Sequence, residues 1–340
     1  MVIRPRDRTV SLHPNGAIVP YPLPPDHFDP AAANDEELRL FGLPTQMAFS
    51  GNRTAAAFRR AFLRHRPGTP PLSFLLAVEP TAGPPPSGII AIAAPVSWPS
   101  QKSMNWSGGY VTPRDGRSFA SVMANWTVPE VSAPTSGNAS EYQSSTWIGL
   151  DGQKRYLDSS LPQIGTRQKR LTQPAPRSEY SSWFQWWARG RDLPIQDLAL
   201  PVDAYDEISA IITVLDETTV RCNLKNVSKG IILQAFDALA PAGLRISGAT
   251  AEWIMERPSP MGSDGWEPYE LPAYTPFAFT ACVAESALPG LPDLREHDLE
   301  GARLIRMYEI AHTPTSVRTI STARRELGPP QRLELTYVAP

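Results

Sequence analysis

From about Ser103 onward the sequence predicts an all-β fold, a sandwich or a barrel. Short alternating or apolar runs recur there between turns rich in Gly, Asn, Asp and Pro, and few stretches are long enough for a helix. Hydrophobic residues make up 41% of the 340-residue chain and charged residues only 19%, which is typical of a globular protein with a sizeable core. The predicted strands are residues 118–128, 144–150, 180–187, 207–215, 220–227, 231–236, 249–256, 277–283, 304–310 and 333–338.

The first hundred residues differ from the rest in composition. We expect a Pro-rich N-terminal extension over residues 1–100 and a β domain over residues 101–340. Nine Arg and no Lys face seven acidic residues in the extension, so its net charge is +2 and that of the remaining chain is −4. These opposite charges suggest a leader, or pro-segment, that docks on the domain by charge. Pro clusters within the extension at 20–30, 67–71 and 84–86.

Two short helices are predicted between these Pro clusters. Residues 34–42 begin with an Asn suited to cap a helix, carry acids in the first turn and end at Gly. Residues 54–66 place Phe58 and Phe62 one turn apart, next to several Arg residues.

Composition and motifs exclude several classes of function. The net charge of −2 argues against a nucleic-acid binder, and the five His residues lack the spacing of metal ligands. Cys222 and Cys282 are either two buried thiols or one bridge. The longest apolar run, residues 89–94, is too short to span a bilayer, and no secretory signal is recognisable at the N-terminus. We expect no cofactor, no metal and no membrane or nucleic-acid partner, and we expect a monomer.

The segment Ala-Glu-Trp-Ile-Met-Glu at residues 251–256 contains two acids on a predicted strand. Strand alternation places Glu252, Ile254 and Glu256 on one face. An acid on an otherwise apolar strand is expensive to bury and is rarely placed without a use. A Glu and a distant Gln such as Gln163, brought together across a sheet, make a minimal hydrolytic pair: the carboxylate activates water and the amide N–H stabilises the oxyanion.

Aromatic residues concentrate on the strand predicted at residues 180–187. Trp183, Gln185 and Trp187 share one face, and Phe184 and Trp186 share the other. One aromatic face packs in the core of a sandwich. The other, with a polar Gln between two Trp residues, is suited to the floor of a binding cleft.

Taken in order, several motifs resemble the glutamic peptidases, also called eqolisins. The resemblance implies a sandwich of two large, curved antiparallel sheets, similar to concanavalin-type lectins, and a secreted endopeptidase active at acidic pH. It implies catalytic roles for Gln163 and Glu256, and substrate-binding roles for Trp147, Asp151 and Trp183. Gln185 stands where the family usually has Glu, and we assign it to substrate binding as well. The motifs are NWSG at 105–108, ANWTVP at 124–129, WIGLDG at 147–152, QIG at 163–165, WFQW at 183–186 and AEWIME at 251–256.

Two alternatives use the same fold. A glycoside hydrolase would use Glu252 and Glu256 as its acid pair; their Cα atoms lie about 13 Å apart on one strand, a gap that leaning side chains would shorten. Ile254 counts against this reading, because such glucanases carry Asp at that position. The second alternative is a non-catalytic sandwich that binds peptide or sugar. The interpretation that fits the motifs best is an endopeptidase with Gln163 and Glu256 as its catalytic pair.

Overall fold

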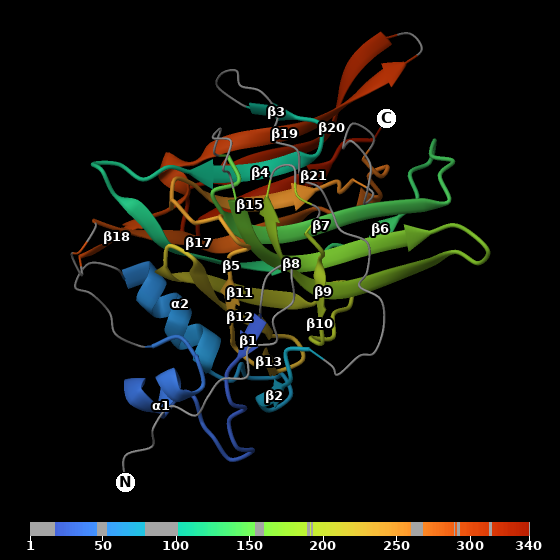
Figure 1. The fold of residues 1–340 in the computed structure, drawn as a ribbon. Coiled ribbons are helices and arrows are strands. Elements are labelled where there is room, and N and C mark those ends of the chain that lie inside the picture. Colours follow the sequence, from blue (N-terminus) through green and yellow to red (C-terminus); the bar gives the residue numbers. More distant parts are fainter. Residues whose placement is uncertain are drawn as a thin grey trace.

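The computed structural model describes residues 18–45, 53–78, 101–153, 160–188, 191, 193–259, 268–288, 290, 293–312 and 315–339. It confirms the all-β prediction, since two large sheets dominate the molecule (Figure 1). The pairing between the named strands of the described chain is antiparallel apart from two short parallel contacts, β3 with β19 and β2 with β13. None of the helices in the described ranges has the length and apolar character needed to cross a membrane.

The first sheet contains all of the candidate site strands. Its order from edge to edge is β10 (Gln196–Leu198), β9 (Arg177–Ala188), β8 (Ser160–Leu171), β7 (Glu141–Leu150), β15 (Ala251–Glu256), β4 (Trp106–Val111) and β19 (Arg303–His312), with β3 (Gln101–Ser103) beside β19.

The second sheet packs behind the first. Its order is β1 (Ile18–Pro20), β14 (Phe236–Leu239), β12 (Thr219–Asn226), β11 (Glu207–Asp216), β5 (Ser118–Thr127), β17 (Phe277–Ala287), β21 (Arg332–Tyr337) and β20 (Thr315–Glu326). Because β20 pairs with both β21 and β19, it joins the two sheets at one edge. Short elements complete the fold: β2 (Ser73–Leu75), β13 (Ile231–Leu233), β18 (Leu294–His297), the 3-10 turn η1 (Leu299–Gly301), and the separate pair β6 (Val131–Ser132) and β16 (Ala273–Tyr274).

Side-chain alternation divides each sheet into an inner and an outer face. The inner faces form the main core, which includes Trp126, Trp186, Trp253 and Phe279. The outer face of the first sheet carries a second, mainly aromatic cluster. Cys222 and Cys282 are both free and buried, so the first of the two cysteine alternatives holds.

The outer face of the second sheet is covered by the N-terminal extension. Both predicted helices are present: α1 (Asp35–Leu40), where Asn34 forms a capping box with Glu37, and α2 (Arg53–Leu63). The buried face of α2, which includes Phe58 and Phe62, packs in one cluster with apolar residues of β5, β11 and β17. Both helices lie on the same side of the molecule, together with β1 and β2 (Figure 1).

Polar contacts hold α2 at its start, middle and end. The backbone N–H of Ala55 donates to Glu296 at 2.7 Å, and Arg59 forms an ion pair with Glu285. At the end of the helix, the buried Lys225 Nζ donates to two carbonyl oxygens, each at 2.7 Å, those of Phe62 and Arg64. Burial lowers the pKa of Lys225 to about 8. These contacts add to the apolar packing, so charge is one of several forces that hold the extension.

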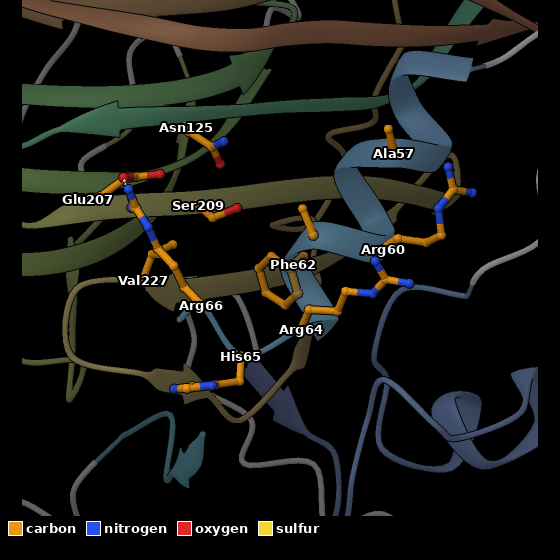
Figure 2. Close-up of a pocket in the computed structure, with 11 residues that line it drawn as sticks. Ala57, Arg60, Phe62, Arg64, His65, Arg66, Asn125, Glu207, Ser209 and Val227 are labelled. Atoms are coloured by element: carbon orange, nitrogen blue, oxygen red, sulfur yellow. Dashed lines mark hydrogen bonds and ion pairs between the residues drawn. The ribbon is translucent and has the colours of Figure 1, made fainter. Parts of the chain in front are cut away.

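A cavity of about 490 Å³ lies between α2 and the outer face of β5 and β11 (Figure 2). An ion pair between Arg66 and Glu207 crosses one side of it, and Asn125 and Ser209 line the sheet side. The extension also donates backbone to the sheet, since β1 pairs with β14 and β2 with β13. Residues 18–45 and 53–78 therefore form part of the sandwich on the side away from the aromatic outer face of the first sheet.

A chain that begins at Ser103 should fold poorly, because it leaves the apolar outer face of the second sheet bare and removes the partners of β13 and β14. In the full chain, Phe62→Ala should lower the free energy of unfolding by about 3 kcal/mol, measured by urea denaturation. Leu40→Ala is the control, because Leu40 is 56% exposed and its loss should change stability by less than about 0.5 kcal/mol. A soluble truncated chain with the melting temperature of the full chain would contradict this prediction and favour a detachable leader.

Candidate active site

One row of residues crosses the first sheet and contains the predicted Gln163. On β8, Gln163 lies opposite Gln185 of β9 on one side and Gly149 of β7 on the other. Gly149 in turn lies opposite Glu252 of β15. Directly paired residues point to the same face of a sheet, so Gln185, Gln163 and Glu252 all point to the aromatic outer face. The residue between Gln163 and Glu252 has no side chain.

Glu256 lies on the same face but in a different row. It pairs with Ser145 of β7 and Trp106 of β4, four residues along the strand from Glu252. That offset corresponds to about 13 Å. Its carboxylate accepts hydrogen bonds from Trp147 Nε1 at 2.8 Å and Asn105 Nδ2 at 3.4 Å. The register thus places Gln163 in the same row as Glu252, with Gly149 of β7 between them, and places Glu256 in a different row.

Glu252 is fully buried, and one of its oxygens has a backbone partner. The N–H of Gln153 donates to Oε1 at 3.2 Å, whereas Oε2 has no hydrogen-bond partner among the described residues. Burial raises the pKa of Glu252 to about 8; the Thr250 hydroxyl partly offsets this effect and the charge of Asp151 adds to it. Burial likewise raises the pKa of Glu256 to about 7, against the opposing effect of its indole and amide donors.

The amide of Gln163 is held on one side only. Its Nε2 donates to Gln185 Oε1 at 3.1 Å, and Gln185 Nε2 donates to the carbonyl oxygen of Leu193 at 2.7 Å. Both Gln side chains are almost completely buried. Within the described part of the chain, Gln163 Oε1 has no partner. Two buried acceptors, Gln163 Oε1 and Glu252 Oε2, are therefore available on neighbouring positions of one row.

Gly149 lies between these two side chains in the row, and its neighbours fill the space around it. A Cβ placed there would lie 2.7 Å from Leu161 Cδ1 and 2.9 Å from a ring carbon of Trp147, closer than such atoms approach in proteins. A larger residue would therefore displace these neighbours. The sequence requires glycine here for steric reasons, since its backbone angles are ordinary.

Aromatic side chains surround the row. Trp147 packs edge-on against Trp106, with ring centroids 5.1 Å apart. Trp183 and Trp187 are buried, and neither indole N–H has a partner among the described residues. Unused buried donors are costly, so these two are candidates to bind a ligand carbonyl. The whole cluster is Trp106, Tyr110, Trp147, Leu161, Trp183, Trp187, Ile195, Ile254 and Ile305.

Asp151, predicted to bind substrate, has its carboxylate occupied by backbone. It follows β7 in a left-handed conformation (φ 70°) and accepts from the N–H groups of Ser247, Gly248 and Ala249 at 2.6, 3.2 and 2.6 Å. These residues immediately precede β15. Asp151 thus fixes the start of the strand that carries Glu252.

Candidate metal ligands do not cluster in the part of the chain that the structure describes, where no group of three or more His, Cys, Asp or Glu residues is placed to hold an ion. The two acids of the outer face, Glu252 and Glu256, belong to separate rows of the sheet.

The sequence assigned the catalytic role to Gln163 and Glu256, and this assignment stays a prediction. Alternation alone assigns Glu252 and Glu256 to one face and does not distinguish them. The signal that separates them is the register of β7 with its two neighbours, which requires the structure. The hydrogen bond from Gln185 to the carbonyl oxygen of Leu193 was also missed, because every residue has a backbone carbonyl and its partner cannot be read from the sequence.

Comparison with known proteins identifies the chain as a hydrolase of peptide bonds. It belongs to the peptidase A4 family, the eqolisins, whose sequence pattern matches residues 104–325. This confirms the resemblance drawn from the motifs. No curated protein matches the chain.

Solved structures support the fold. Scytalidoglutamic peptidase with a peptide-based transition state analogue has a TM-score of 0.53 and 19% identity. The same peptidase with a transition state analogue inhibitor has a TM-score of 0.51 and 19% identity. In both cases the match covers 69% of this chain and 98% of the other. These likenesses confirm the sandwich architecture.

Gly149→Ala should lower peptidase activity at least tenfold, because the added methyl group collides with Leu161 and Trp147 beside the row. Overpacking of this kind also costs about 1–3 kcal/mol of stability, measurable by thermal unfolding. Gly301→Ala is the matched control, since a Cβ there meets nothing within 4 Å. Full activity in Gly149→Ala would show that catalysis does not depend on the packing around Gly149.

Proposed function

We propose that this peptidase is an endopeptidase whose catalytic pair is Gln163 and Glu252. The observation that carries the proposal is the row itself: two buried acceptors, Glu252 Oε2 and Gln163 Oε1, flank a residue without a side chain. The proposal takes Glu252 as the partner of Gln163 because the two share a row. Glu256, the partner that the family resemblance implies, is the alternative.

A water molecule between the two side chains would donate one hydrogen bond to each free acceptor. Its lone pair would then be directed at the carbonyl carbon of a bound peptide. Ionised Glu252 takes a proton from the water as its oxygen attacks, and the second N–H of Gln163 stabilises the oxyanion of the tetrahedral intermediate. Glu252 then gives the proton to the leaving nitrogen, and the C–N bond breaks. The cycle ends with Glu252 ionised again.

The remaining predicted residues have supporting roles in this proposal. Trp147 lies in the row between those of Glu252 and Glu256 and donates to the Glu256 carboxylate at 2.8 Å, so Glu256 orients an aromatic side chain beside Glu252. Trp183 offers an indole N–H to the peptide backbone of the substrate. Asp151 acts through β15, since its hydrogen bonds fix the backbone that precedes Glu252.

Glu252→Gln and Gln163→Leu should each lower kcat by at least two to three orders of magnitude, without additivity in the double variant. Glu256→Gln should be much milder, because a Gln oxygen still accepts from Trp147 Nε1. The measurement is cleavage of a denatured protein and of a fluorogenic peptide, with folding checked by near-UV circular dichroism.

The opposite pattern, with Glu256→Gln inactive and Glu252→Gln active, would restore the Gln163–Glu256 pair. Equal loss in both, together with cleavage of β-glucan, would favour the glycoside hydrolase.

The pH profile follows from the general base. Glu252 must be ionised to accept the proton, and burial raises its pKa to about 8 from an ordinary value of 4.5. Activity should therefore fall as pH falls through a value well above 4.5, so the optimum lies nearer neutrality than the mildly acidic range expected for an ordinary Glu. The measurement is kcat/KM from pH 3 to 9. A profile that stays flat down to pH 4 would show that the base in the free enzyme is not a buried carboxylate.

A further inference from the structure

The orientation of the Gln163 amide is fixed by its neighbour in the row. Gln185 lies between Gln163 and the Leu193 carbonyl and is bonded to both. A backbone carbonyl only accepts hydrogen bonds, so the nitrogen of Gln185 must face Leu193 and its oxygen must face Gln163. That oxygen in turn only accepts, so Gln163 must present its nitrogen to Gln185. If the Gln163 amide turned over, two oxygens would face each other in a buried site.

This chain of hydrogen bonds determines which Gln163 atoms remain for chemistry. One N–H of Nε2 is used by Gln185, which leaves Oε1 and the second N–H available. These are the water acceptor and the oxyanion donor of the proposed mechanism. We propose that Gln185 is a positioning residue that holds the Gln163 amide in its active orientation at every pH. The inference depends on the proposed catalytic role of Gln163.

The pH independence follows from the chemistry of the amide. Gln185 does not titrate, whereas a carboxyl at this position could donate to the Leu193 carbonyl only while protonated. The charged groups that face Gln185 from the adjacent strands are few within the described chain. Arg167 of β8 and Asp197 of β10 neutralise each other at 2.9 Å, and Glu252 lies beyond Gln163 and Gly149.

The test compares three variants over pH 4–9. Gln185→Leu removes both hydrogen bonds and should lower kcat roughly 10- to 100-fold at all pH values with little change in KM, because the oxyanion donor loses its orientation. Gln185→Glu should approach wild-type kcat at low pH and lose activity as the new carboxyl ionises. Its charge should also raise the pKa of Glu252 and move the acidic limb to higher pH. Gln163→Leu combined with Gln185→Leu should be no worse than Gln163→Leu alone.

Gln168→Leu is the matched control. Gln168 is a fully buried Gln on the opposite face of the same strand, bonded to Ser144 and Thr166 at 3.2 and 2.8 Å. Its loss should lower the melting temperature and leave kcat unchanged. A Gln185→Leu variant with wild-type kcat, or additive effects in the double variant, would overturn the inference. Retained activity in Gln163→Leu would instead overturn the proposed catalytic pair, so the two failures are distinguishable.

Discussion

The candidate site depends on the register of β15, β7, β8 and β9. A shift of one residue in any of these pairings would turn a whole strand over and move its outward side chains into the core. The core prevents such a shift, because Ile148 and Leu150 of β7 alternate with the outward Trp147 and Gly149 and are fully buried between the sheets. The packing of one face therefore fixes the chemistry of the other. This is why Gln163 and Glu252, distant in sequence, share a row with only a glycine between them.

The outer face of the first sheet holds the carboxyl groups of Glu252 and Glu256 among aromatic rings. Burial in this apolar environment disfavours the ionised form of each carboxyl group. The hydrogen bonds that offset this cost differ between the two acids. Glu256 has an indole and an amide donor directed at its oxygens. Glu252 has donors in the Thr250 hydroxyl and the backbone of residues 152–153, while its Oε2 has no partner in the described chain. A fully satisfied buried carboxylate is structural in character, and a partly satisfied one retains capacity for a ligand or a proton. Glu252 and Glu256 thus point to the same face of the strand but differ in the hydrogen bonds that their carboxylates accept.

Much of the architecture followed from local pattern. Period-two alternation and turn residues predicted the strands, and the spacing of Phe58 and Phe62 predicted the buried face of α2. The pairing of Gln163 with one acid rather than the other was beyond such reasoning, because register is set by contacts between strands far apart in sequence. The apolar packing of the extension on the second sheet was beyond such reasoning for a similar reason. Charge is visible in a sequence, whereas the apolar outer face of β5, β11 and β17 becomes recognisable only when those strands lie side by side.

The raised pKa values of the two buried acids also link protons to folding. In the unfolded chain these groups would titrate near the ordinary value of 4.5, whereas the folded chain holds their protons up to about 8 for Glu252 and about 7 for Glu256. Between 4.5 and these values the folded state binds more protons than the unfolded state, so the contribution of both groups to stability decreases as pH rises. Mild acid thus favours the fold at these positions. The ionised Glu252 that would act as general base is the form that the folded chain disfavours. The proposed catalysis requires Glu252 to lose its proton, whereas the stability of the fold is greater when Glu252 keeps it.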